Sequence, residues 1–202
     1  MIHMQKQLFP GLWTDTPASR YFHHPPVLET SRLILRPLRM RDARDLFSWC
    51  SDPQVTRYVL WSAHQSPRET RDYIRYVRHL YRERMPSSWG IVNRDRDQVI
   101  GTIGLMAWSP ENSSCEIGYS LARECWGRGF MTEAASRLIR SLFEDLGVNR
   151  IEARHDLRNP ASGRVLEKCG MRKEGVLRSG IINKGETVDI ALWAILKSDF
   201  VP

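Results

Sequence analysis

The sequence predicts an α/β (α+β) domain in which helices flank a single β-sheet. Segments with strand alternation and segments with helical periodicity follow one another along the chain. Two of the strand segments, residues 89–92 and 99–108, are separated only by a short polar turn, which predicts an antiparallel hairpin. The length of 202 residues suffices for one filled core, so we expect a single domain over residues 28–202 after an N-terminal extension at residues 1–27.

The first quarter of the chain contains the extension, one strand and one helix. Residues 1–27 include several prolines and no sustained period, which predicts an irregular arm. Residues 32–36 alternate as a strand that ends at Pro37. The next apolar residues fall at helical spacing, namely Ala43, Leu46, Phe47 and Cys50.

A long helix is predicted to begin after Ser66. Ser66, Pro67 and Glu69 match the N-cap, N1 and N3 positions of a capping box, and Pro86 ends the pattern. The helix carries one apolar stripe and a separate basic row formed by Arg68, Arg71, Arg75, Arg78 and Arg82. We interpret this row as a solvated face, with binding of RNA or an acidic substrate as the alternative.

The second half of the chain alternates strands with helices. Strands are predicted at residues 115–121, 151–155 and 187–196. A long amphipathic helix runs from Met131 to Gly147, and a shorter one from Pro160 to Cys169 ends at Gly170.

Composition restricts the class of protein. The chain is 42% hydrophobic and 26% charged, which is typical of globular domains and not of disordered or fibrous chains. Its net charge of +7 favours anionic partners such as nucleic acid, ribosomes or a phosphorylated cofactor. The four cysteines lack metal-ligand spacing, so we expect no metal and a reducing, cytoplasmic location. No apolar run reaches the length of a membrane span, and no secretory signal is evident.

The most informative segment, residues 115–135, runs from a strand through a glycine-containing turn into a long helix. The free N–H groups and the partial positive charge of a helix N-terminus bind phosphate, and Gly127 and Gly129 allow close approach of the backbone. The GxxxxGK[ST] loop of NTPases is absent, and Thr132 occupies the third glycine position of a GxGxxG turn. A short Gly-x-Gly turn remains.

This turn resembles the pyrophosphate loop of GNAT acetyltransferases, written [Q/R]-x-x-G-x-[G/A], and residues 126–134 are similar to the RimJ/RimL branch of that superfamily. Glu124 departs from the pattern because Gln or Arg is usual there. Similar features at residues 28–36, 116–119 and 159–170 extend the resemblance over most of residues 28–197. It implies the GNAT fold, with a mostly antiparallel mixed sheet of about seven strands that is splayed in the middle.

The resemblance also implies a cofactor site for acetyl-CoA. The pantetheine arm would pair with the backbone of Ile117, Gly118 and Tyr119, as an added strand does. The pyrophosphate would lie on backbone amides of Cys125, Trp126, Gly127, Arg128, Gly129 and Phe130. Asn159 matches the motif asparagine, although Asn followed by Pro160 also predicts a helix N-cap.

Two residues are candidates for the chemistry. Glu116 could deprotonate the acceptor amine, through a water if needed, or it could be a surface or salt-bridged residue. Ser162 could bind cofactor and supply a proton or hydrogen bond to the leaving thiolate, or it could serve the helix end. No cysteine has an evident histidine partner, so we expect direct attack in a ternary complex.

We expect a cytoplasmic N-acetyltransferase that modifies a primary amine, most simply a protein N-terminal α-amino group of the ribosomal type. An α-amino group, with a pKa of about 7.7 to 8.0, loses its proton more easily than lysine, at about 10.4. Ribosome association and a monomeric or homodimeric state are further expectations. The alternatives are acetylation of a small amine, polyamine or antibiotic, and a catalytically inactive module that binds acetyl-CoA and RNA.

Overall fold

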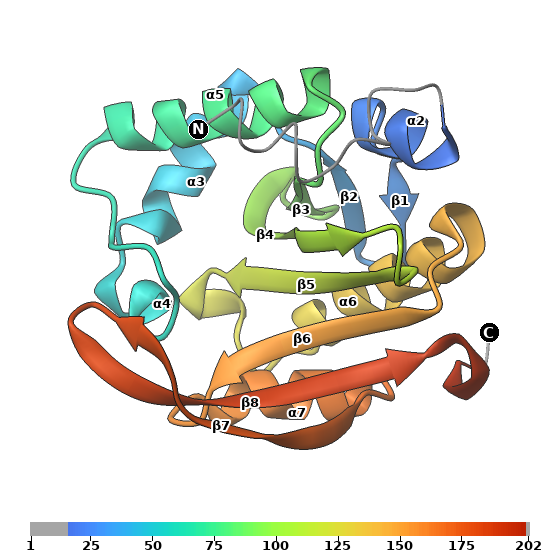
Figure 1. Cartoon of the computed structure of the whole chain (residues 1–202). Coiled ribbons are helices and arrows are strands. Elements are labelled where there is room, and N and C mark those ends of the chain that lie inside the picture. The colour runs from blue at the N-terminus through green and yellow to red at the C-terminus, as the bar shows by residue number, and fades with distance from the viewer. Residues whose placement is uncertain (1–15, 201–202) are drawn as a thin grey trace.

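The computed structural model describes residues 16–200, which form one eight-stranded sheet in the order β1-β2-β3-β4-β5-β6-β8-β7 (Figure 1). The strands are β1 (Leu28–Glu29), β2 (Leu33–Pro37), β3 (Ser88–Asn93), β4 (Gln98–Ser109), β5 (Ser114–Leu121), β6 (Arg150–Asp156), β7 (Arg172–Asn183) and β8 (Glu186–Leu196). Every neighbouring pair is antiparallel except β5 and β6, which are parallel. The expectation of a mixed, mostly antiparallel sheet is confirmed, with eight strands where about seven were expected.

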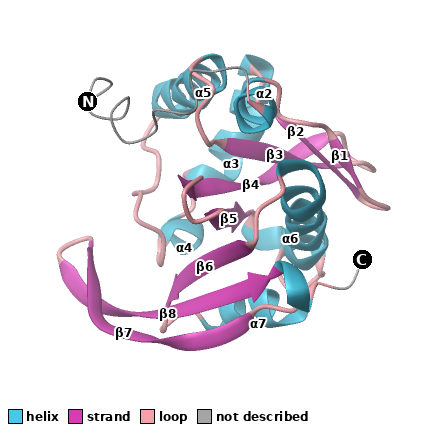
Figure 2. Ribbon diagram, turned by 45° about the vertical axis from the view of Figure 1, so that its right-hand side comes forward, coloured by secondary structure: helices cyan, strands magenta, loops and turns pink. Residues whose placement is uncertain are grey.

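Six α-helices flank the sheet within the described range. They are α2 (Pro17–His23), α3 (Ala43–Cys50), α4 (Pro53–Thr56), α5 (Pro67–Arg82), α6 (Phe130–Ser141) and α7 (Pro160–Lys168). Helices α6 and α7 lie behind the sheet in Figure 1, and α3 and α5 lie against the part formed by β2, β3 and β4 (Figure 2). Residues 99–105 of β4 are all buried, as expected for a strand with both faces covered.

Helix α2 corrects one expectation. Residues 1–27 were predicted to be irregular, but Pro17–His23 form a helix whose Thr16 cap accepts a hydrogen bond from the Ser19 amide. Phe22 is 2% exposed and its ring contacts Trp108 edge to face. The prediction failed because a helix of seven residues is too short to show a period, although the Thr-Pro start was a signal. Residues 1–15 of the predicted arm lie outside the described residues.

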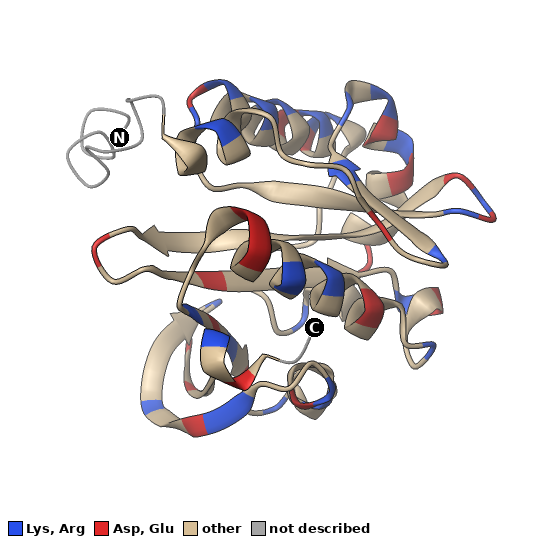
Figure 3. Ribbon diagram, turned by 90° about the vertical axis from the view of Figure 1, so that its right-hand side faces the viewer, with Lys and Arg blue, Asp and Glu red and all other residues tan. Residues whose placement is uncertain are grey.

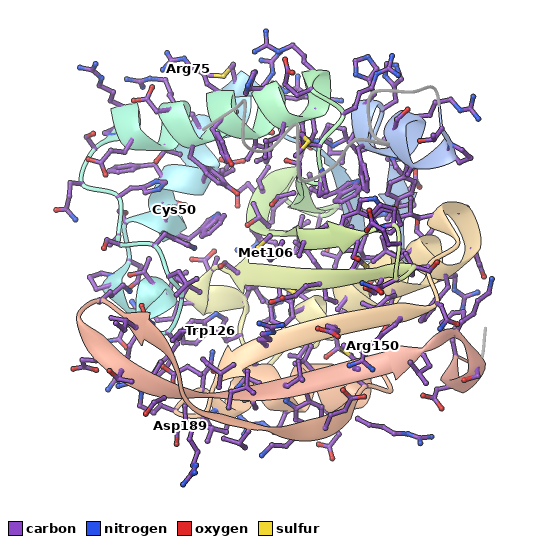
Figure 4. The ribbon with its side chains drawn as sticks, viewed as in Figure 1. Cys50, Arg75, Met106, Trp126, Arg150 and Asp189 are labelled. Carbon is purple, nitrogen blue, oxygen red and sulfur yellow. The ribbon has the colours of Figure 1, made fainter. Side chains whose placement is uncertain are left out.

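Helix α5 begins as its sequence predicts. The Ser66 side chain accepts a hydrogen bond from the Glu69 amide, and Pro67 occupies the first turn. The Glu69 carboxylate accepts from the amide of Gln65, one residue before the cap. The five arginines of the basic row are exposed, which agrees both with a solvated face and with the alternative of binding RNA or an acidic substrate. Figure 3 shows basic positions along α5 at the top of the molecule. Arg75 projects away from the body of the protein (Figure 4).

The long helix that follows the glycine turn is continuous in direction but changes its winding. Helix α6 ends at Ser141, and a π-helical turn at Leu142–Leu146 continues it to Gly147. Gly147 has φ 74°, a left-handed conformation typical of the residue that closes a helix. The helix and its end were both predicted.

Strand β7 was not predicted from the sequence. Its residues are mostly exposed, so the alternation that marks a half-buried strand is missing. It pairs with β8 at the outer edge of the sheet, with register shifts between Lys173 and Gly175 and between Leu177 and Ile181. The short elements β1 and α4 were missed for lack of length.

Candidate active site

The sheet opens between β5 and β6. These strands pair only from Ser114 with Arg150 to Ile117 with Ala153. Beyond that point β5 continues to Leu121, paired with β4, and β6 continues to Asp156, paired with β8. Each strand therefore has one unpaired backbone edge facing the gap, and the expected splay of the sheet is present.

A cavity of about 500 Å³ occupies this splay. That volume is typical of small-molecule and cofactor sites. Its walls come from β5, the turn after β5, the first turn of α6, the end of β6 and helix α7. Of the residues predicted for the site, the cavity is lined by Ile117, Gly118, Tyr119, Cys125, Trp126, Gly127, Gly129, Phe130, Asn159 and Ser162. Glu116 and Arg128 are not among the lining residues.

The turn between β5 and α6 needs glycine at two positions. Gly127 has φ 71° and Gly129 has φ 77°, a region that residues with a Cβ rarely adopt. Gly129 is the N-cap of α6, and no side chain caps the helix there. In residues 16–200 the amides of Gly127, Arg128, Gly129 and Phe130 have no hydrogen-bond partner. The turn therefore presents free donors at the positive end of a helix, which is an anion site.

Two of the six backbone amides that were expected to bind the pyrophosphate already donate hydrogen bonds within the protein. The Cys125 amide donates to the Ala122 carbonyl at 2.9 Å, and the Trp126 amide donates to the Arg123 carbonyl at 3.1 Å. A short 3₁₀ turn precedes the glycines and takes up these donors, which the sequence did not reveal. The available donors are therefore those from Gly127 onward.

Glu124, which replaces the usual Gln or Arg, does not line the cavity. Its carboxylate is exposed and lies 3.4 Å from the Arg96 guanidinium. Trp126, in the turn between β5 and α6 (Figure 4), donates its indole N–H to the Leu121 carbonyl at 2.8 Å and so holds the turn against the end of β5.

A polar network ties the glycine turn to the start of β2. The Glu133 carboxylate of α6 accepts hydrogen bonds from Thr30, from the Arg32 amide and from the Arg32 guanidinium. Arg32 also donates to the Arg128 carbonyl at 3.0 Å and lies over the Phe130 ring. Burial raises the pKa of Glu133, but the hydrogen bonds from Thr30 and Arg32 outweigh it and leave the pKa below its usual value.

Tyr119 and Ser162 meet inside the cavity. The Tyr119 hydroxyl lies 2.9 Å from Oγ of Ser162 and donates to the Ser162 carbonyl at 3.1 Å. Burial raises the pKa of Tyr119, so this phenol stays protonated. Asn159 Oδ1 accepts from the Ser162 amide at 3.3 Å, which confirms that Asn159 caps α7.

Glu116 lies two residues before the first unpaired residue of β5, on the face of the strand opposite Ile117. Its carboxylate is 3.5 Å from the Arg154 guanidinium, and Arg154 lines the cavity. Burial raises the pKa of Glu116, Arg154 lowers it, and Glu152 raises it, with a net upward shift. Glu116 is thus ion-paired and also held at a higher pKa than an exposed glutamate.

Several cavity residues were not in the sequence prediction. Gln54, Val55, Tyr58 and Val59, from α4 and the segment after it, complete one wall. Nothing in the local pattern marks them because they approach the cavity only through the fold. The cavity is also lined by Arg164, in the middle of α7, and by Lys168, at its end.

His155 and Asp156, at the end of β6, also line the cavity. The Nδ1 atom of His155 donates to the Asp156 carbonyl at 2.8 Å, so Nε2 carries the lone pair in the neutral ring. A Cβ on Gly163 would lie 2.9 Å from Nε2. This contact explains the glycine that follows Ser162.

Comparison with known proteins decides the family. The family described as "Acetyltransferase (GNAT) domain" matches residues 32–172. This chain belongs to the GNAT acetyltransferases. It is 38% identical to the uncharacterized N-acetyltransferase YoaA of Bacillus subtilis (strain 168), over 85% of this chain and 97% of that protein. It is 25% identical to the [ribosomal protein uS5]-alanine N-acetyltransferase of Escherichia coli (strain K12), over 87% and 93%.

Solved structures agree with this assignment at the level of the fold. A GNAT-family acetyltransferase from Bacillus anthracis superposes with a TM-score of 0.78 and 24% identity, over 86% of this chain and 99% of that one. The protein is a GNAT N-acetyltransferase, and the family uses acetyl-CoA. The residues fit this cofactor, because an unpaired strand edge leads to a turn with free amides at a helix N-terminus.

Two further features, a metal site and a membrane-spanning helix, were sought among the described residues. Within residues 16–200, no group of three or more His, Cys, Asp or Glu side chains is arranged to hold a metal ion. None of the helices in this range combines the length and the apolar character needed to cross a membrane.

Proposed function

We propose that this GNAT enzyme acetylates the α-amino group of a protein N-terminus, with acetyl-CoA as donor, by direct attack in a ternary complex. The observation that carries the proposal is the similarity to the ribosomal protein uS5-alanine N-acetyltransferase of E. coli, which extends over 183 residues. The four cysteines are all free thiols, which fits a reducing compartment such as the cytoplasm.

Within this proposal, the backbone of the splay and the glycine turn bind the cofactor. Ile117, expected to pair with the pantetheine arm, is already paired with Ala153, so the arm pairs instead with the free edge of Gly118, Tyr119 and Ser120. The amides from Gly127 to Phe130 bind the diphosphate. The cofactor supplies an acetyl thioester, whose carbonyl carbon forms the new C–N bond as the C–S bond breaks.

Glu116 serves as the general base in this proposal. It accepts a proton from the acceptor amine through a water, because its carboxylate lies beside the cavity rather than in its wall. A raised pKa improves a carboxylate as a base near neutral pH, and an α-amino group requires only a modest base.

Ser162 donates a hydrogen bond to the leaving thiolate. Its Oγ lies 2.9 Å from the oxygen of the Tyr119 phenol, which stays protonated. The single phenol proton can move from the Ser162 carbonyl to Ser162 Oγ when the Ser162 hydroxyl donates to the thiolate. Asn159 fixes the backbone of Ser162 at the first turn of α7. These contacts therefore hold the Ser162 hydroxyl where the thioester end of the pantetheine arm would lie.

A thiol-release assay with a panel of amines tests the proposal. We expect release of coenzyme A with peptides that carry a free N-terminus, and at least tenfold slower release with N-blocked lysine peptides, polyamines or aminoglycosides, about 1.4 kcal/mol in transition-state free energy. Faster release with a small amine would contradict the proposed acceptor. Cofactor binding without release in any case would support the inactive module instead.

A further inference from the structure

Helix α7 presents two basic side chains to the cofactor cavity. Arg164 and Lys168 lie one turn apart on the helix, both are exposed, and both line the cavity. Residues at this spacing share one helix face. The two cations therefore form a single positive patch on the wall of the cavity.

These two cations differ from the other cations of the cavity. Arg154 lies beside Glu116 and Glu152, and Arg158 is paired with Asp156 and Glu186. Arg164 and Lys168 form no ion pair with any residue in the described range 16–200. Their charge is therefore available to a bound anion.

The position of the patch indicates which part of the cofactor it meets. The start of α7 lies beside Tyr119, where the thioester end of the pantetheine arm belongs. The far end of α7 lies against α6, since Cys169 Sγ contacts the Thr132 carbonyl at 3.6 Å and the Ser136 hydroxyl at 3.5 Å. The cations thus lie toward the side of the glycine turn.

Coenzyme A carries one further phosphate beyond its diphosphate, the dianionic 3′-phosphate of the ribose. We infer that Arg164 and Lys168 bind this 3′-phosphate and so distinguish coenzyme A from its 3′-dephospho form. The inference rests on the proposed cofactor site in the splay, and it adds a specificity-determining pair that this site does not include. A phosphate dianion between two unpaired cations forms charge-assisted hydrogen bonds.

Calorimetric titration of the full chain with coenzyme A and with 3′-dephospho-coenzyme A tests the inference. We expect the wild type to bind coenzyme A roughly five- to tenfold more tightly than the dephospho form, as for two solvent-exposed ionic contacts. In the double variant Arg164→Gln/Lys168→Gln the ratio falls to about one, and the affinity for the dephospho form is retained. The ratio in the wild type should also fall as salt is raised.

A matched control has the same change in charge at the same spacing elsewhere. Arg78 and Arg82 are exposed, lie one turn apart on α5 and do not line the cavity. Arg78→Gln/Arg82→Gln should keep the wild-type ratio. Equal affinities in the wild type, or an unchanged ratio in the α7 variant, would overturn the inference and leave the cofactor site standing. A wild type that binds neither ligand would overturn both.

Discussion

Two glycines of this protein share a backbone conformation but not a location. Gly127 in the turn and Gly147 at the end of the π-helical segment have φ 71° and 74°, and a Cβ on either would meet no atom within 4 Å. Alanine at either position therefore costs only backbone strain, about 1 kcal/mol in free energy of unfolding. Comparison of the two alanine variants therefore separates an effect on stability from an effect on cofactor binding.

We expect Gly127→Ala and Gly147→Ala to lower the free energy of unfolding by similar amounts in denaturant titrations. Only Gly127→Ala should weaken binding of coenzyme A, by roughly five- to tenfold, because relief of the strain moves the amides of the turn. Equal affinities in the two variants would exclude the turn as the diphosphate site.

Glu116 is paired with Arg154, and we propose that it also acts as the general base. We expect Glu116→Gln to lower kcat about 100-fold, the lower range for loss of a general base, with the affinity for acetyl-CoA unchanged. Because burial raises the pKa of Glu116, the wild-type rate should fall on the acidic side at a pH above that of an ordinary glutamate. That limb should disappear in the variant.

Glu152 provides the matched control for this prediction. It pairs with Glu116 across the two strands and lies 3.6 Å from the same Arg154 guanidinium. Its charge raises the pKa of Glu116, so Glu152→Gln should retain turnover and move the acidic limb to lower pH. A Glu116→Gln variant with wild-type turnover would remove Glu116 from the mechanism.

At the scale of elements, the glycine turn depends on the segment that enters β2. Glu133→Gln should lower the free energy of unfolding by about 1 kcal/mol and weaken coenzyme A binding severalfold, because Arg32 loses its carboxylate partner beside the turn. The pKa of Glu133 is below its unfolded value, so its stabilisation is present above about pH 4.3 and is lost as the pH falls through the folded pKa.

Urea titrations at several pH values, with calorimetry for the ligand, measure this effect. Asp72→Asn is the control, because Asp72 is exposed and its pairs with Arg68 and Arg75 lie on the solvated side of α5. We expect no measurable change there. A Glu133→Gln variant that behaves like Asp72→Asn would show that the network does not support the turn.

Helix α2 also belongs to this scale. Phe22 is almost fully buried against Trp108, so Phe22→Ala should lower the free energy of unfolding by about 3 to 5 kcal/mol. Val27→Ala, at a side chain that is 56% exposed, should change it little. Similar small losses in both variants, by urea titration, would mean that α2 does not contribute to the core.

The elements that the sequence predicted are those whose signals are local. The cap at Ser66 and the stripe of α6 specify helices without reference to the rest of the chain. Strand β7 was missed because it is mostly exposed and is defined by its pairing with β8, and helix α2 was missed because it is too short to show a period. The Cys125 and Trp126 amides were expected to be free because a single 3₁₀ turn is too short to show in the sequence pattern.

At the scale of the whole molecule, the proposed cofactor site is a gap whose walls come from several elements. The sequence pattern of residues 115–135 predicted one wall of the cavity, and the resemblance to GNAT proteins predicted that the sheet is splayed. The wall from α4 and the cations of α7 required the fold, since α4 and α7 approach the cavity from distant parts of the sequence.

We propose that the free amides from Gly127 to Phe130, beside the parted strands β5 and β6, bind the diphosphate of coenzyme A. The most direct measurement is the change in backbone amide ¹H–¹⁵N resonances as coenzyme A is titrated into the full chain. We predict that the largest changes occur at residues 127–130 and along Gly118–Ser120. Saturable binding that leaves these resonances unchanged would show that the diphosphate binds elsewhere.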